Sequence, residues 1–273
     1  MFDHLNAAGP LLTSLVSSPP DFVTKDGSLK NFIVEYYVYT ASISLISIDP
    51  RPTTIIFLTP DLTSQAHKLV ESSYIGQLCG CWLELLLLIP RIFDFGRRSL
   101  ASESSATNPP FPTADDFATF SALQMQILGF NTYLLGLAPG SDVALCGQIF
   151  QQAVHLYLLT CLPSSRDSDG PQKTAVNAAI GHAFEFLRQL SPLSRINTSL
   201  CWALAVVGSC ISDAKLQAEL RQRLSTMFGV IGLGNIQATA AVLERVWELP
   251  AEQRSPWVIC KVMQEHEIWI SFA

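Results

Sequence analysis

The stretch SLCWALAVVGSCISDAKLQAELRQRL, residues 199–224, decides the fold class of this 273-residue chain. Its first half is an apolar run long enough for a short buried helix. Its second half follows Ser212 and Asp213, either of which can cap a helix N-terminus, and places Leu216, Leu220 and Leu224 on one helical face. We therefore expect two consecutive helices here, an apolar one and an amphipathic one.

The same helical spacing recurs on both sides of this stretch. Apolar residues repeat at three- and four-residue intervals in residues 29–40, 176–190 and 236–247. The alternation of apolar and polar residues that indicates strands is nearly absent. Each such helix has an apolar face that needs a neighbour, so the sequence predicts an all-α fold: a single irregular multi-helix domain over residues 1–273.

Two polar segments divide this predicted domain. Residues 99–112 and 163–171 are rich in Ser, Pro and small polar residues, which is typical of loops. They separate N-terminal helices in 1–98, central helices in 113–162 and C-terminal helices in 172–270. Residues 50–60, with Pro at each end and no partner strand, are interpreted as an extended connector.

Local signals place several helix ends. Thr113 and Asp116 can cap a helix that we expect to continue to about Leu137. Asn235 is expected to cap the helix that ends near residue 249. Glu219 and Arg223 lie four residues apart in the order that favours an ion pair on a solvated helix face.

Composition excludes two function classes. The chain has 17 Lys+Arg and 23 Asp+Glu, a formal charge of −6. With 49% hydrophobic residues it can offset the entropy of folding, which excludes general disorder. The shortage of cations excludes an autonomous electrostatic grip on nucleic acid. Because only 15% of the residues are charged, part of the apolar excess is expected to line a pocket or an interface.

Nothing in the sequence indicates export or a membrane span. The first residues lack a basic n-region. The most hydrophobic stretch, residues 74–90, contains Glu84, stops at Pro90 and is too short for a bilayer, so we expect a buried helix. The seven cysteines are scattered through apolar segments without C-x-x-C spacing, which indicates core residues in a reducing compartment rather than a zinc site.

Motifs that resemble ligand sites have simpler structural explanations. Gly229, Gly232 and Gly234 lack the strand, the spacing and the Lys of a phosphate loop, and indicate a helix end with left-handed glycines. His266 has no second His one turn on, and Asp115 beside Asp116 suits a helix N-terminus. We therefore predict no metal, no cofactor and no assigned catalytic residue.

If the chain is an enzyme, three residues are candidates for acid–base chemistry. His155 and His182 lie within strongly apolar helices, where a His can serve as a general base, although a satisfied core His is the commoner case. Glu84 is flanked by Leu, and burial alone would raise its pKa. We expect it to be paired, with Arg91 as one partner, or to lie at an edge, and hypothesise that it lines a pocket.

Four longer stretches together resemble the C-terminal regulatory domain of fungal-specific transcription factors of the zinc binuclear cluster type. They are residues 32–51, FIVEYYVYTASISLISIDPR; residues 74–96, YIGQLCGCWLELLLLIPRIFDFG; residues 199–224; and residues 232–247, GLGNIQATAAVLERVW. Trp202, Gly208, Asn235, Leu243 and Trp247 occupy the family's characteristic positions. These are packing motifs without a catalytic signature.

The resemblance implies an α-helical regulatory domain that is nuclear in its relatives, often dimeric, and in one sterol-responsive branch similar to a receptor for an apolar small molecule. Family members normally begin with a zinc cluster of six cysteines and a basic linker, and this sequence has neither. We therefore expect no direct nucleic-acid binding, a protein partner or homodimer, an apolar ligand, and a place in the nucleus or cytoplasm.

Three functions follow from the sequence. The first is a regulator of transcription in fungal metabolism that acts through protein contacts, more consistent with the sequence than catalysis. The second is an enzyme of fungal specialised (secondary) metabolism, of cyclase or lyase type, derived from this domain. The third is a non-functional truncated regulator.

Overall fold

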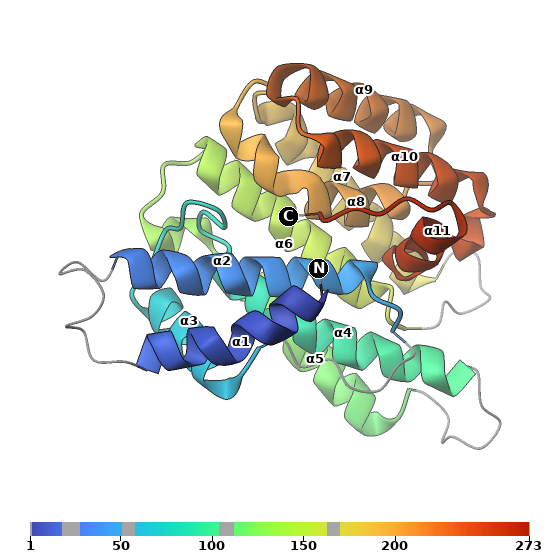
Figure 1. The fold of residues 1–273 in the computed structure, drawn as a ribbon. Helices are drawn as coiled ribbons and strands as arrows, with labels where there is room; N and C mark the ends of the chain where they lie inside the picture. Colours follow the sequence, from blue (N-terminus) through green and yellow to red (C-terminus); the bar gives the residue numbers. More distant parts are fainter. Residues whose placement is uncertain (1, 18–27, 51–57, 104–111, 163–169, 273) are drawn as a thin grey trace.

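The computed structural model describes residues 2–17, 28–50, 58–103, 112–162 and 170–272. Within these residues all regular structure is helical, with no strand, which confirms the predicted all-α class (Figure 1). The α-helices are α1 (Phe2–Ser17), α2 (Ser28–Ser44), α3 (Pro60–Glu71), α4 (Leu83–Glu103), α5 (Ala114–Gly129), α6 (Asp142–Leu159), α7 (Pro171–Gln189), α8 (Cys201–Ser209), α9 (Ala214–Ile231), α10 (Gly234–Glu248) and α11 (Ile259–Glu265).

Helix α6 lies in the middle of the molecule. It packs on α7 and α8 on one side and on α4 and α5 on the other, and in Figure 1 it runs between the N-terminal helices and the group α7–α11. Every residue of α8 is buried, as the apolar run at 201–209 predicts. One cluster of buried apolar residues extends from α1 to the C-terminal tail, and on this ground we propose a single folding unit.

Helices α8, α9 and α10 meet at Gly208. A Cβ added at Gly208 would lie 2.6 Å from Leu243 Cδ1 and 2.9 Å from Leu220 Cδ2, so a larger residue would have to displace both leucine side chains. The indole nitrogen of Trp247 donates a hydrogen bond of 2.9 Å to the carbonyl oxygen of Gly208. The guanidinium of Arg221 covers the outer face of the Trp247 ring, 5.2 Å from its centre.

Several predicted helix ends are confirmed. Thr113 and Asp116 form a capping box, in which each side chain accepts a backbone amide of the other residue. The hydrogen bonds from Thr113 hold the pKa of the Asp116 carboxyl below its usual value. Asp213 accepts the amides of Lys215 and Leu216 at the start of α9. Gly232 ends α9 in the left-handed conformation.

Other predicted ends are wrong. Helix α5 ends at Gly129 rather than near Leu137, because the Gln151 side chain donates to the carbonyl oxygens of Ile127 and Phe130 and satisfies the terminus there. Asn235 is not a cap, since α10 begins at Gly234 after Leu233. Sequence spacing does not show which neighbouring elements supply such contacts.

The predicted pair Glu219–Arg223 is also wrong. Glu219 binds Arg188 of α7 at 2.7 Å. Arg223 donates instead to the Leu190 carbonyl oxygen at the C-terminus of α7 and to Asn197 Oδ1 of the 3-10 helix Arg195–Leu200, each at 2.8 Å. Contacts between helices thus replace the contact expected within α9.

The predicted boundaries around α4 also need correction. Residues 74–82 are not helical; α4 begins at Leu83 and continues through Pro90 to Glu103. Proline removes one backbone hydrogen bond, and here packing against α2 and α6 keeps the helix continuous. Residues 99–103 are helix, and Pro171 is the first residue of α7. The last helix, α11, ends at Glu265 rather than near residue 270. Residues 51–57, 104–111 and 163–169 of the predicted connector and loops lie outside the described residues.

We expect the substitution Gly208→Ala to lower the free energy of unfolding by about 1–3 kcal/mol, because the added methyl group overlaps Leu243 and Leu220. Gly181→Ala is the matched control: Gly181 also lies within a helix, and its Cβ would meet nothing within 4 Å. That control should gain roughly 0.5–1 kcal/mol. Urea unfolding of both variants checks the difference, and equal stabilities would contradict the packing role of Gly208.

Candidate functional site

The structure places the three predicted acid–base residues on three different helices. His155 lies on α6 and is 9% exposed, whereas His182 on α7 and Glu84 on α4 are exposed. Within the described ranges, no hydrogen bond or ion pair joins any two of the three. These residues therefore do not form the kind of catalytic group in which one side chain orients another.

His155 lies at the contact between α6 and α5. Its Nε2 is 3.1 Å from the side-chain nitrogen of Gln124. Because an amide nitrogen can only donate, this contact places the ring proton on Nδ1. Burial lowers the pKa of the ring, so His155 is neutral near pH 7 and acts in the structure as a hydrogen-bonding core residue.

Glu84 lies at the edge of the core rather than within it. It occupies the first turn of α4, where the helix dipole favours a carboxylate. The Leu residues beside it in sequence point inward, while Glu84 points out. Arg91 is not its partner, since Arg91 Nη1 donates to Gln126 Oε1 at 2.7 Å. The edge alternative of the sequence analysis holds, and the pairing alternative fails.

A different acidic residue, Glu35, is more deeply buried than Glu84. It lies on α2, is fully buried, and accepts four hydrogen bonds from the loop of residues 72–82. Tyr74 Oη donates at 2.9 Å, and the amides of Gln77, Leu78 and Cys79 donate at 3.2, 2.6 and 2.8 Å. We call Glu35 and these four donors the Glu35 clasp.

The clasp is a structural anchor. All donors that point at the Glu35 carboxylate already belong to the loop, so it has no open side for a substrate. A Cβ at position 76 would overlap the carboxylate, which explains Gly76. Burial, together with Glu35, raises the pKa of Tyr74 and of Cys79. The signal in the sequence was a single acidic residue within the aromatic helix FIVEYYVY, and periodicity alone does not reveal its partners.

A series of aromatic contacts, which we call the aromatic stack, runs through the core; Tyr157 meets Trp202 edge-on, and the other neighbouring rings are stacked. Neighbouring ring centres lie 4.6–6.1 Å apart. In order, the rings of this aromatic stack are Trp82, Phe150, Trp202, Tyr157, Trp257 and Phe93. Part of the apolar excess noted in the sequence is therefore used for packing between α4, α6 and α8.

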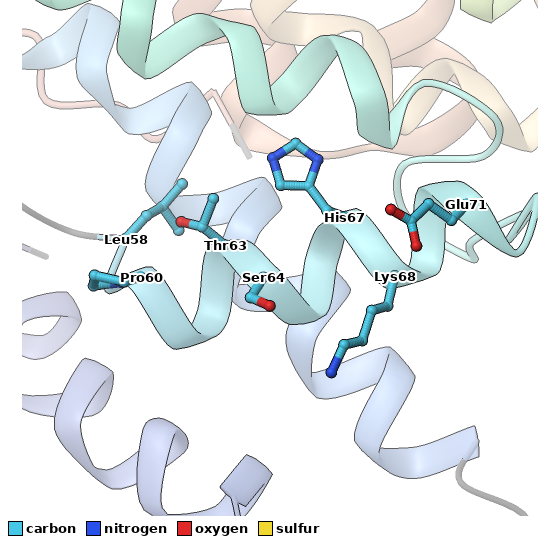
Figure 2. Close-up of a pocket in the computed structure, with 7 residues that line it drawn as sticks. All are labelled: Leu58, Pro60, Thr63, Ser64, His67, Lys68 and Glu71. Atoms are coloured by element: carbon cyan, nitrogen blue, oxygen red, sulfur yellow. The ribbon is translucent and has the colours of Figure 1, made fainter.

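A groove on the surface of α3 is the pocket that the close-up shows (Figure 2). It is open to solvent, and its lining mixes apolar and polar groups. The lining residues are Leu58, Pro60, Thr63, Ser64, His67, Lys68 and Glu71. An apolar ligand needs an enclosed, largely apolar cavity, and this groove does not have that character.

The cysteines behave as core residues. All seven are free, with Cys210 half-buried and the others buried. Burial raises the pKa of the Cys201 thiol to about 11 and that of Cys210 to about 12. Nowhere in the described part of the chain are three or more His, Cys, Asp or Glu residues grouped so that they could hold a metal ion. In the same residues, none of the helices has both the length and the apolar character needed to cross a bilayer.

The family to which the chain belongs is shown by its sequence match to a known family model. The sequence model described as fungal specific transcription factor domain matches residues 3–273. The chain belongs to this family. No curated protein and no solved structure matches the chain. Membership confirms the resemblance stated above and supports a regulator-like role.

The family's characteristic residues form packing contacts in this fungal specific transcription factor domain. Trp202 lies fully buried in the aromatic stack. Gly208, Leu243 and Trp247 contact one another where α8 meets α10. The carbonyl oxygen of Asn235 accepts the Thr239 hydroxyl at 2.7 Å within α10. Trp202, Gly208, Leu243 and Trp247 thus contribute to the packing of the core, whereas the contact of Asn235 is made by its backbone.

We expect stability to fall at acidic pH partly through His155. Its pKa is lowered in the folded state, so its contribution is complete above the unfolded value of about 6.5 and is lost as the pH falls through the folded value. His155→Gln should flatten the loss of unfolding free energy between pH 7.5 and pH 5. His182→Gln, at an exposed position, serves as the control and should leave the profile unchanged.

Breaking the Glu35 clasp should destabilise the fold strongly. Glu35→Ala leaves three amides, of which that of Cys79 is buried, and the Tyr74 hydroxyl without their acceptor, and we expect a loss of at least ~3 kcal/mol in urea unfolding. Glu35→Gln retains one acceptor oxygen and should lose less. Glu71→Ala changes an exposed Glu on α3 and should stay within about 0.5 kcal/mol of the parent; a similarly small effect at position 35 would refute the clasp.

Proposed function

We propose that this fungal specific transcription factor domain is a transcriptional regulator that acts through protein–protein contacts and does not bind DNA by itself. The observation that carries the proposal is the family match over residues 3–273. The fold is consistent with this proposal, because the residues at the positions that resemble the family, such as Trp202 and Trp247, pack in the core. A regulatory domain of this kind needs a stable surface rather than a reactive centre.

The charge distribution supports contacts with proteins rather than with phosphates. The chain carries a net charge of −6, and several of its Arg side chains already bind carboxylates. These pairs are Arg97–Asp94, Arg98–Asp116, Arg188–Glu219, Arg221–Glu244 and Arg245–Glu248. A nucleic-acid surface instead needs clustered cations with free donors.

An apolar small molecule and a role in fungal metabolism complete the proposal, as the family resemblance implies. The aromatic stack occupies the centre of the core, so the ligand would bind at another place in the chain or on its surface. We propose the nucleus as the place of action, since that is where a regulator of transcription meets its partners.

The enzyme alternative has less support. Its candidates His155, His182 and Glu84 lie on separate helices, and His155 is engaged by Gln124. A cyclase or lyase would need such groups to converge on one substrate. The reporter experiment below also tests the alternative that the chain is a non-functional truncated regulator.

We expect the chain to alter transcription several-fold when it is fused to an unrelated DNA-binding domain and tested on a reporter. The DNA-binding domain alone, at matched expression, is the control. The unfused protein should not shift duplex DNA. An unchanged reporter would favour the non-functional alternative. Turnover of a metabolite by the purified protein, abolished by His155→Ala or His182→Ala, would favour the enzyme.

A further inference from the structure

A tight turn follows helix α7 and presents a serine to solvent. It consists of residues 191–194, Ser-Pro-Leu-Ser, and the Ser194 amide closes it by donating to the Ser191 carbonyl oxygen at 3.1 Å. Ser191 is exposed and Pro192 is half-buried. The Ser191 hydroxyl oxygen accepts the Leu193 amide at 3.3 Å. We call residues 191–194 the Ser191 turn.

The guanidinium of Arg223, on α9, lies against the Ser191 turn. Its Nη2 donates to the Ser191 carbonyl oxygen at 3.4 Å, the longest of its four hydrogen bonds. The other three acceptors are the carbonyl oxygens of Leu187 and Leu190 and the side-chain oxygen of Asn197. All four acceptors are uncharged oxygens, so the guanidinium fixes the end of α7 without meeting an anion.

The charge of Arg223 is only partly compensated. Its side chain is half-buried, and burial lowers the pKa of the guanidinium. In the part of the chain that the structure describes, no carboxylate forms an ion pair with it, whereas Arg221 on the same helix binds Glu244. Because a cation withdrawn from water is held best by an anion, Arg223 is positioned to receive one from the adjacent turn.

We propose that Ser191 is a phosphorylation site for a proline-directed protein kinase, and that its phosphate binds Arg223. Pro192 directly follows the serine, as kinases of this class require. In the transfer, the bond between Ser191 Oγ and the γ-phosphorus of ATP forms, the bond from that phosphorus to ADP breaks, and the hydroxyl proton passes to the base of the kinase. This inference goes beyond the proposed function and adds a means to control the regulator.

Two opposing effects decide where the phosphate lies. The C-terminus of α7 and Asp142, which accepts the Ser194 hydroxyl, both repel a negative charge at this turn. Arg223 attracts it with a full positive charge and already reaches the Ser191 backbone. To bind the phosphate, Nη2 gives up only its 3.4 Å contact, and the Ser191 carbonyl oxygen keeps the Asn197 side-chain nitrogen at 2.9 Å. The phosphate is therefore expected to tie the turn to α9.

Other described residues that precede a proline are less suited to a kinase. Thr59 uses its hydroxyl oxygen to cap α3. Ser255 follows Arg254, which holds the C-terminus of α10 by donating to carbonyl oxygens. Its setting is thus similar to that of Ser191, but Ser255 is half-buried and Pro256 is buried. A kinase must reach both the serine and the proline, so Ser255 provides a matched comparison.

The first experiment incubates the folded full chain with a purified proline-directed kinase and Mg-ATP, and locates the phosphate by mass spectrometry. We expect phosphate on Ser191, which Ser191→Ala abolishes and Ser255→Ala leaves unchanged. Assignment to single residues separates Ser191 from Ser18, which also precedes a proline and lies outside the described residues. An unmodified Ser191, or equal modification of Ser191 and Ser255, would overturn the proposal. Either result leaves the reporter test of the proposed function unaffected.

The second experiment follows the phosphate of the phosphorylated chain by a phosphorus NMR titration. Phosphoserine in water has a second pKa of about 6, and contact with Arg223 should bring it to about 5, because the cation favours the dianion. Arg223→Lys lacks the planar fork and should lose at least about half of this change. Arg195→Gln, at an exposed Arg of the neighbouring 3-10 helix, is the control and should keep it.

The measurement on the parent chain needs no variant, so the test survives if Arg223→Lys fails to fold. Thermal unfolding shows whether both variants are folded at the temperature of the titration. A phosphate that titrates as in water, or a change that is lost in Arg195→Gln and kept in Arg223→Lys, would overturn the assignment of Arg223 as its partner.

Discussion

The contact of Phe150 with two tryptophans is the interaction on which the rest of the fold depends. Its ring lies 4.8 Å from that of Trp82 and 5.9 Å from that of Trp202, stacked with both. This contact ties the start of α4, the middle of α6 and the fully buried α8 together. Helices without strong amphipathic character can be held in place in this way, because large flat rings bury much area in few contacts.

Periodicity predicted the helices well because it reports burial. The apolar faces expected in residues 29–40, 176–190, 199–224 and 236–247 lie on helices of the structure, apart from Leu190, which directly follows α7, and the connection 210–213 between α8 and α9. It predicted polar partners poorly, because hydrogen bonds and ion pairs form between elements whose arrangement the sequence does not state. Arg223 binds the end of α7 rather than Glu219, and Gln151 ends α5.

The two acidic residues Glu84 and Glu35 also show that sequence alone predicts polar contacts poorly. The apolar neighbours of Glu84 in sequence favour a buried position, yet Glu84 lies in the first turn of α4 and is exposed. Glu35 is less conspicuous in the sequence, yet it is fully buried. Only knowledge of the loop that surrounds Glu35 separates the two cases. The regulator-like role therefore rests on the family match over residues 3–273.

The Glu35 clasp has an evolutionary consequence. Surface loops usually tolerate insertions and deletions, but three successive amides here must reach one carboxylate while Gly76 passes against it. One residue more or fewer would shift the amides out of reach. Related chains that retain an acidic residue at position 35 are therefore expected to keep this loop at constant length, even where their surface helices diverge.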